Sequence, residues 1–187
     1  MAEEELVRAY NAMSDSRKEY VDRFKVASAK KARIVADSTA RNAIASESGI
    51  NPENIEFDKS SKGKPFAVNA QIRFSVSHSA DIVICATSEK EIGADIEKIR
   101  EIRFETAKRF ASAEELEYIK QNKENYFKIW TLKEAYFKCI GTGLGADIKS
   151  VVFSIDGNRI ACSQEGFNFR FCNVDPEYIC AVCEKSE

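Results

Sequence analysis

The sequence has few prolines and glycines, which interrupt helices and strands, and it has no long apolar runs. It holds only three prolines and eight glycines in 187 residues, a composition that excludes collagen-like chains and Pro/Gly-rich disordered ones. No run approaches the ~18 consecutive apolar residues of a membrane-spanning helix. The acidic segment 1–10 also lacks an apolar core of signal-peptide length. We therefore expect a globular, cytoplasmic protein with no membrane association.

An excess of charge of one sign is also missing. Lysine and arginine total 28 and aspartate and glutamate 30, which gives a net charge of −2. No overall basic excess therefore favours a nucleic-acid partner, and none is expected. Basic residues do gather locally, because residues 17–33 hold seven of them and only two acids. This cluster fits either a solvated helical face or an anion site.

Six cysteines are present, and two of them form a C-x-x-C pair, Cys180 and Cys183. A zinc or redox site is one interpretation of this pair. The surrounding residues 178–183 are typical of a strand, however, and residues three apart on a strand face opposite sides, which is poor geometry for one metal ion. Small, buried, reduced cysteines are the favoured interpretation, and they agree with a cytoplasmic location.

The 44% of hydrophobic residues supply a core for one large domain or two small lobes. Helices are expected over residues 5–25, 30–47, 102–110, 112–119 and 126–140, and strands over 55–57, 72–77, 82–86, 92–97, 151–154, 159–163, 167–173 and 178–184. Both halves run from helix to strands, a faint internal repeat. The pattern predicts an α+β fold of two pseudo-repeated lobes, residues 1–90 and 91–187, with a ligand site at their interface.

Two acids lie close together in the segment Gly93-Ala94-Asp95-Ile96-Glu97. On a strand, Asp95 and Glu97 point to one face, with Cα atoms roughly 6.5 Å apart. Two carboxylates at this spacing can share a hard cation such as Mg²⁺, and without a cation they repel each other. The alternative is an exposed strand end with ordinary acidic residues.

A second group of polar residues falls on one helical stripe. Trp130, Glu134 and Lys138 follow one another at intervals of four, so that Glu134 and Lys138 are expected to pair. One interpretation is a surface salt bridge. Flanking aromatic residues leave little of this helix free to face water, which favours a charged pair at the edge of a cleft. Trp130 itself is interpreted as a packing residue.

Two further residues are ambiguous when taken alone. His78 is the only histidine, and it lies where a strand gives way to a turn in Phe74-Ser75-Val76-Ser77-His78-Ser79. A lone histidine is usually structural, but beside three serines it is also a candidate phosphate ligand. Lys64, in the turn Gly63-Lys64-Pro65, has the same two interpretations.

Taken in order, these motifs resemble the 4′-phosphopantetheinyl transferases, specifically the longer, two-lobed type that activates carrier proteins of fatty-acid, polyketide and nonribosomal peptide synthesis. Each motif is weak, but the ordered set is specific. The matching segments are residues 63–65, 74–79, 93–98, 110–115, 130–138 and 141–144. The resemblance implies two pseudo-repeated lobes, each an antiparallel sheet packed with helices, with coenzyme A between them and an apo acyl or peptidyl carrier protein as partner.

The resemblance also implies residue roles. Asp95, Glu97 and Glu134 hold Mg²⁺ against the pyrophosphate of coenzyme A, and Glu134 is the general base for the carrier serine. Lys138 lies near the leaving phosphate and helps to protonate it. His78 and Lys64 are assigned to the nucleotide end, including the 3′-phosphate, and Ser77, Lys31 and Arg17 to coenzyme A binding. The family's phosphate contacts in the first helices match without a firm register, so Lys30 and Arg33 are candidates as well. A Ser/His/Asp triad is not expected, because no covalent enzyme intermediate is needed.

Two departures and two alternatives remain. Ala94 stands where the family usually has a larger aliphatic residue, and residues 1–10 have a helical pattern where long members usually open with a strand. A metal-dependent nucleotide phosphohydrolase would use the same acids with water in place of serine. A non-catalytic protein that binds coenzyme A would need neither Glu134 nor Lys138, so their presence favours a transferase. Two lobes in one chain make a monomer sufficient.

Overall fold

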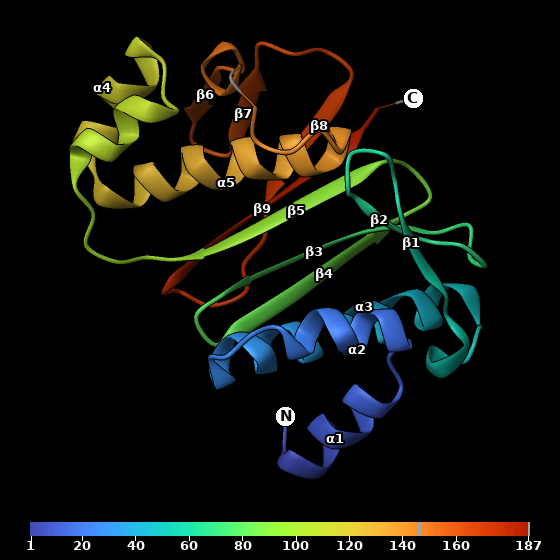
Figure 1. Cartoon of the computed structure of the whole chain (residues 1–187). Coiled ribbons are helices and arrows are strands. Elements are labelled where there is room, and N and C mark those ends of the chain that lie inside the picture. Colours follow the sequence, from blue (N-terminus) through green and yellow to red (C-terminus); the bar gives the residue numbers. More distant parts are fainter. Residues whose placement is uncertain (146, 187) are drawn as a thin grey trace.

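Two long helices, α3 (Ala27–Ser48) and α5 (Lys123–Ile140), lie on opposite sides of the strands β3 (Arg73–Ser79), β4 (Ile82–Ser88) and β5 (Ile92–Lys98) in a computed structural model of the chain (Figure 1). The structure describes residues 1–145 and 147–186. From one side to the other, the layers are α3, the hairpin β3–β4, the sheet that contains β5, and α5. Buried apolar residues fill each of the spaces between these layers. None of the helices in the described ranges is long and apolar enough to cross a membrane.

The N-terminal half begins with three helices. The helical segment expected over residues 5–25 comprises two helices, α1 (Glu3–Asn11) and α2 (Asp15–Asp22). Ser14 separates them, because its hydroxyl accepts a hydrogen bond from the Arg17 amide and starts α2 as an N-cap. Helix α3 ends at Gly49, whose φ of 73° is the left-handed conformation that glycine adopts without strain.

Two pairs of antiparallel strands follow α3. After the short 3₁₀ helix η1 (Pro52–Asn54), strand β1 (Phe57–Lys59) pairs with β2 (Pro65–Ala67). The strand expected over residues 55–57 therefore begins two residues later, because η1 occupies the preceding chain. Strands β3 (Arg73–Ser79) and β4 (Ile82–Ser88) form the predicted hairpin.

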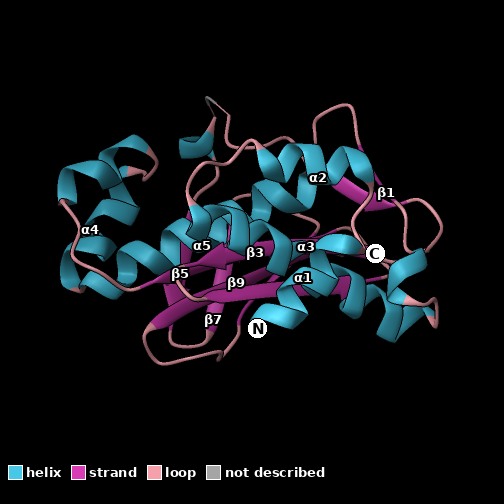
Figure 2. Cartoon of the chain, turned by 60° about the horizontal axis from the view of Figure 1, so that its bottom comes forward, coloured by secondary structure: helices cyan, strands magenta, loops and turns pink. Residues whose placement is uncertain are grey.

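The C-terminal half repeats the plan with helices and antiparallel strands. Its elements are β5 (Ile92–Lys98), the 3₁₀ helix η2 (Phe104–Arg109), α4 (Ala113–Gln121), α5, the 3₁₀ helix η3 (Ile148–Ser150), β6 (Phe153–Asp156), β7 (Arg159–Cys162), β8 (Phe167–Phe171) and β9 (Tyr178–Lys185). Strand β9 lies between β5 and β8, and β6 pairs with β7. Seen from below in Figure 2, strands β3, β5 and β9 lie next to one another among the helices. This arrangement is a two-lobed α+β fold, as predicted.

Helix α5 is anchored by a charged pair inside the protein. Lys133 Nζ lies 2.9 Å from a carboxylate oxygen of Glu115 on α4, and both side chains are fully buried. The ammonium also donates to the carbonyls of Ile148 and Val151, and Glu115 accepts from the Phe153 amide. A buried charge needs such partners, because it has lost its water. The pair fixes α5 to α4 and to the start of β6.

Gly93 lets strand β5 lie directly on α5. A Cβ atom added at Gly93 would lie 2.0 Å from the Ala135 carbonyl oxygen and 2.3 Å from the Cys139 amide nitrogen. Backbone atoms of a helix cannot yield that much space, so that only glycine fits here. The close approach brings the next residues of β5 within reach of side chains on α5.

Three serines of β3, here called the serine seam (Ser75, Ser77 and Ser79), join β3 to β5. In the described part of the chain, the two strands belong to different hydrogen-bonded sheets. Ser75 Oγ accepts from the Ala94 amide at 2.9 Å, and Ser79 Oγ accepts from the Lys98 amide at 3.0 Å. Serines at every second position of a strand reach the same neighbour. Strand β3 therefore runs parallel to β5 and holds it in register.

The C-x-x-C pair lies on a strand, as predicted. Cys180 and Cys183 are both buried on β9, and every cysteine of the chain is a free thiol. Burial raises the pKa of the Cys180 thiol to about 12. A thiol with so high a pKa is a poor metal ligand and a poor nucleophile, which agrees with a packing role.

Candidate active site

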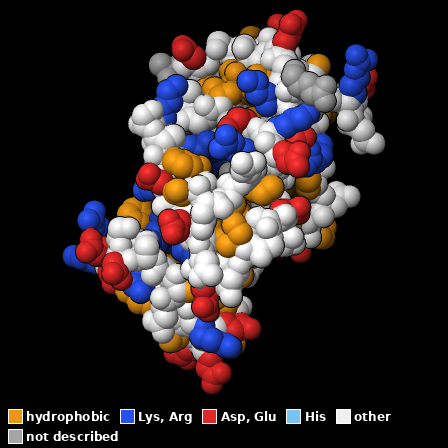
Figure 3. All heavy atoms as spheres, turned by 90° about the vertical axis from the view of Figure 1, so that its right-hand side faces the viewer, with side chains coloured by type: hydrophobic (Ala, Val, Ile, Leu, Met, Phe, Trp, Pro, Cys, Tyr) orange, Lys and Arg blue, Asp and Glu red, His pale blue; other side chains and the backbone are white. Residues whose placement is uncertain are grey.

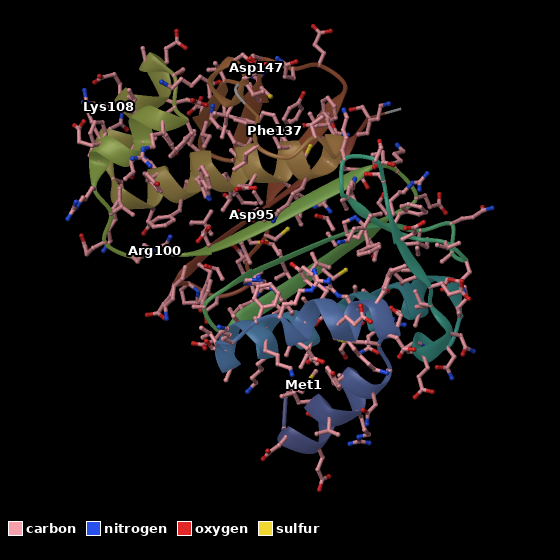
Figure 4. All side chains as sticks on the ribbon, in the orientation of Figure 1. Met1, Asp95, Arg100, Lys108, Phe137 and Asp147 are labelled. Atoms are coloured by element: carbon pink, nitrogen blue, oxygen red, sulfur yellow. The ribbon has the colours of Figure 1, made fainter. Side chains whose placement is uncertain are left out.

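The predicted acids of β5 face the predicted stripe of α5. Trp130 Nε1 donates to Glu97 Oε1 at 3.3 Å, and Lys138 Nζ lies 2.7 Å from Asp95 Oδ1. Asp95 lies between β5 and α5 in Figure 4. Because the stripe repeats every helical turn, Glu134 comes between these two contacts. The structure thus brings together the carboxylates and the lysine that the sequence placed in one site.

Asp95 is the most buried of the site acids, with 4% of its surface exposed. Its Oδ1 atom accepts hydrogen bonds from Ser77 Oγ and Lys138 Nζ, each at 2.7 Å. Its Oδ2 atom is buried and has no hydrogen-bond partner among the described residues. Burial raises the pKa of Asp95, although Lys138 and Ser77 favour the ionised form. One oxygen of this carboxylate is therefore available to a ligand.

Lys138 pairs with Asp95 and not with Glu134, the partner expected from helical spacing. Its ammonium donates to Asp95 Oδ1, to Ser77 Oγ at 2.9 Å and to the Ala94 carbonyl at 3.2 Å. These three acceptors match the three donors of an ammonium group. The correction has a simple reason: β5 lies so close to α5 that its acid outcompetes a neighbour on the same helix.

Glu134 has the properties of a base that works near neutral pH. Its side chain is half-buried. Burial raises the pKa of this carboxyl to about 7, with a further upward contribution from the charge of Asp95, a downward one from Lys138 and a small upward one from Glu97. A carboxyl with such a pKa accepts a proton far better than an ordinary glutamate.

Glu97 is held by three donors. Its Oε1 atom accepts from Trp130, and its Oε2 atom accepts from Ser79 Oγ and Arg100 Nη1, both at 3.0 Å. The sequence did not reveal these partners. Trp130 was interpreted as a packing residue, but its indole N–H also positions a carboxylate. The sequence could have indicated Ser79, because serines at every second residue of a strand place their three hydroxyls on one side. No sequence pattern indicated Arg100.

The carboxylates fit a divalent cation in kind but are not gathered around one point. No three His, Cys, Asp or Glu side chains within residues 1–145 and 147–186 converge closely enough to form a ready metal centre. Three acids nevertheless share one side of the α5–β5 contact, and Asp95 Oδ2 is an unpartnered buried oxygen. Hard oxygen donors with unrelieved negative charge suit Mg²⁺. Asp95 and Glu134, with Glu97 beside them, are the residues that would hold it.

Two adjoining hollows lead to this site. A cleft of about 680 Å³ is lined by residues of α2, α3 and β1, including Arg17, Tyr20 and Lys59. A smaller hollow of about 260 Å³ reaches from Lys62 to Lys138 and has Gly63, Pro65, Phe74 and Val76 in common with the cleft. In Figure 3, several Lys and Arg side chains lie in the upper part of the face, with Asp and Glu side chains among them. A continuous groove thus runs from the N-terminal half to the end of α5.

The residues predicted at the nucleotide end are distributed unevenly along this groove. Arg17 lines the large cleft and lies 3.3 Å from Asp37, a buried acid of α3. Lys31 and His78 are exposed and lie outside the lining of both hollows. Lys59, at the end of β1, and Lys62, in the β1–β2 turn, line the groove and were missed. A cluster of lysines around the Gly63 turn was the available signal.

Lys64 joins the two halves of the chain. Its ammonium donates to Glu91 Oε2 at 2.7 Å, to the Ile92 carbonyl at 3.2 Å and to the Cys139 carbonyl at 2.9 Å. The last contact satisfies a carbonyl at the C-terminus of α5, where a positive charge is favourable. Its predicted contact with the nucleotide stays a prediction, because all three donors of the ammonium are already used.

Comparison with known proteins gives two matches to family models. Residues 91–183 match the model described as the 4′-phosphopantetheinyl transferase superfamily. Residues 2–90 match the model described as 4′-phosphopantetheinyl transferase, N-terminal. Together these two segments extend over nearly the whole chain.

Individual relatives agree. The chain is similar to the 4′-phosphopantetheinyl transferase Sfp of Bacillus subtilis (strain 168), with 31% identity over 98% of this chain and 87% of that protein. A second Bacillus subtilis 4′-phosphopantetheinyl transferase is 32% identical over 80% of this chain and 72% of its own length. The 4′-phosphopantetheinyl transferase gsp of Aneurinibacillus migulanus is 41% identical over 59% of this chain, and that match spans less than half of the relative, 47%.

Proposed function

The chain belongs to the 4′-phosphopantetheinyl transferase superfamily, and from that premise we propose that it moves the 4′-phosphopantetheine group of coenzyme A to a serine of an apo carrier protein. The serine oxygen forms a bond to the phosphorus nearest the pantetheine, and the bond from that phosphorus to the bridging oxygen breaks. The products are the holo carrier protein and 3′,5′-ADP.

The chain's own residues support each part of this reaction. Glu134, with its pKa near 7, takes the proton of the serine hydroxyl as the new bond forms. Lys138, fixed by Asp95 and Ser77, places its ammonium at the end of the groove, where it offsets the charge that develops on the leaving phosphate. Mg²⁺ held by Asp95, Glu134 and Glu97 would neutralise the pyrophosphate.

Coenzyme A fits the groove with its nucleotide end in the large cleft. Arg17, Lys59 and Lys62 supply positive charge for the 3′-phosphate and the pyrophosphate along the way to Lys138. The volume of about 680 Å³ lies in the range of pockets that hold drug-sized molecules, roughly 300–1,000 Å³. His78 and Lys31 would reach the ligand only at the rim of the groove.

One observation carries the proposal. A base with a pKa near 7, an immobilised ammonium and a buried unpartnered carboxylate oxygen lie together, and the ammonium, that of Lys138, lines the end of the groove. A protein that only binds coenzyme A has no use for such a base. Hydrolysis of a nucleotide would use the same groups with water as nucleophile, so an experiment must separate that reaction from transfer.

The test is incubation of the protein with coenzyme A, Mg²⁺ and several apo carrier proteins, followed by mass spectrometry of the carriers. We expect a carrier to gain the mass of one phosphopantetheine group, and we expect Glu134→Gln to abolish the gain while the protein stays folded. Release of phosphate from nucleotides without any mass gain would favour a phosphohydrolase. Binding of coenzyme A with neither reaction would favour a non-catalytic protein.

We further propose that the chain acts as a monomer in a reducing compartment such as the cytoplasm. Both walls of the groove come from one chain, because Lys62 and Phe74 belong to the N-terminal half, and Phe137 and Lys138 to the C-terminal half. The cysteines are all free thiols, the state that the cytoplasm maintains. Gel filtration of the active enzyme tests the monomer.

A further inference from the structure

The carboxylates of the site differ in how many of their oxygen atoms already accept hydrogen bonds. Glu97 uses both oxygens, since Oε1 accepts from Trp130 and Oε2 accepts from Ser79 and Arg100. Asp95 keeps its buried Oδ2 atom without a partner in the described part of the chain. A cation that enters between these acids therefore meets one open carboxylate and one that is already neutralised. Glu97 Oε1 can still accept one more ligand, but Arg100 already offsets the charge of this carboxylate, so a cation binds Glu97 more strongly once Arg100 has left.

Arg100 is the partner that can leave most easily. Trp130 and Ser79 are half-buried members of α5 and β3. Arg100 follows β5 in an irregular segment (Figure 4), and its side chain is 60% exposed, against 21% for Glu97. Its Nη1 atom donates to Glu97 Oε2 at 3.0 Å and to the Lys98 carbonyl at 3.4 Å. An exposed ion pair of this kind is weak, because water replaces it at little cost.

We propose that Arg100 is a competing counter-ion for Glu97: it neutralises this carboxylate while the site is empty and withdraws into solvent when a divalent cation enters between Asp95 and Glu134. Trp130 and Ser79 keep the carboxylate aimed at the site throughout. Arg100 thus lowers the affinity of the resting enzyme for the cation. Because Glu97 binds the cation strongly only after Arg100 withdraws, Asp95 and Glu134 bind the cation before Glu97 does. This inference rests on the proposed function, which supplies the cation.

The test compares Mg²⁺ binding by the wild-type protein and by Arg100→Gln, with and without coenzyme A, by isothermal titration calorimetry. Emission from Trp130 gives a second signal, because it is the only tryptophan and its indole touches Glu97. We expect Arg100→Gln to bind Mg²⁺ about two- to fivefold more tightly, the range set by a weak exposed ion pair. The difference should shrink as ionic strength rises, because salt screens the Arg100–Glu97 pair in the wild type.

Lys98→Gln is the matched control. It removes one positive charge from the same segment, but Lys98 pairs with Glu177 at 3.5 Å and not with Glu97. We expect its Mg²⁺ affinity to equal that of the wild type. Equal tightening in both variants would replace the direct contact with a general effect of charge, and unchanged or weaker binding in Arg100→Gln would overturn the inference. If the wild type binds no Mg²⁺ in either condition, the role of Mg²⁺ in the proposed function is also overturned.

Discussion

At the scale of the residue, the site holds more negative charge than its surroundings neutralise. Lys138 on Asp95 and the exposed Arg100 on Glu97 supply two positive charges for three carboxylates. The cost appears as raised pKa values for Asp95 and Glu134. Such pairs of acids commonly mark functional sites, because burial without a ligand destabilises their charged forms.

The pKa of Glu134 predicts the pH dependence of transfer. Only the ionised carboxylate can accept the serine proton, and burial raises its pKa from 4.5 to about 7. As pH falls below 7, the protonated fraction grows, and kcat/KM should drop by about tenfold for each pH unit. The rate should level off above pH 7. A profile measured at constant ionic strength with one carrier protein checks this, and a flat profile between pH 5.5 and 8.5 would remove Glu134 as the base.

A substitution at Ser77 distinguishes a role in positioning Asp95 and Lys138 from a role in binding coenzyme A. The Ser77 hydroxyl donates to Asp95 and accepts from Lys138, although the family resemblance assigned it to coenzyme A binding. We expect Ser77→Ala to lower kcat by about tenfold, the cost of losing one hydrogen bond to a charged group, with little change in the KM for coenzyme A. A rise in that KM at unchanged kcat would restore the ligand role.

Ser75→Ala is the control for that substitution. It removes the same hydroxyl from the same face of β3, but Ser75 contacts the Ala94 amide and neither Asp95 nor Lys138. Its kcat should therefore stay close to that of the wild type. Equal losses in both variants would mean that the seam as a whole, and not the hydroxyl of Ser77, supports catalysis.

At the scale of the element, the contact between β5 and α5 depends on Gly93. Gly93→Ala would place a methyl group 2.0 Å from the Ala135 carbonyl oxygen, so the strand and helix must separate. We expect a loss of about 3 kcal/mol in the free energy of unfolding, typical of overpacking, together with a large loss of activity. Urea denaturation measures the first. Gly145→Ala, where an added Cβ atom would meet nothing within 4 Å, should change little.

The sequence predicted elements well where local chemistry determines them. Ser112 and Glu115 have the spacing of a capping box and begin α4, Asn51 before Pro52 is the N-cap of η1, and Gly141 ends α5. Contacts between elements were harder to foresee. The pairing of Lys138 with Asp95 depends on how closely β5 approaches α5, and no local pattern encodes that distance.

At the scale of the whole molecule, the site exists because two halves of the chain meet. The groove takes basic residues from the N-terminal half and Lys138 from the other. The division between residues 90 and 91 stays a prediction; the two family matches cover residues 2–90 and 91–183. The carboxylates were proposed from their spacing within the C-terminal half together with the ordered motifs of the family. The cleft was not, because its walls come from segments far apart in the sequence.

Lys64 gives a test of how the halves are joined. Lys64→Met removes one ion pair and two hydrogen bonds to carbonyls, so we expect the free energy of unfolding to fall by about 2 kcal/mol. If Lys64 only joins the halves, the KM for coenzyme A should stay within about twofold at a temperature where the variant is folded. A tenfold rise in that KM in Lys64→Met but not in Glu91→Gln, which keeps the ammonium, would show instead that Lys64 binds the ligand.

The serine seam also affects how the protein can change over generations. A ladder of backbone hydrogen bonds tolerates almost any side chain, because every residue except proline carries the same donor and acceptor. Here the register of β3 on β5 is held by hydroxyl groups at three alternate positions. A single-base change that replaces one serine with a residue lacking a hydroxyl therefore removes one of the side-chain hydrogen bonds between β3 and β5. The contact of β3 with β5 thus depends on three serine codons, and a mutation in each codon can weaken it independently of the other two.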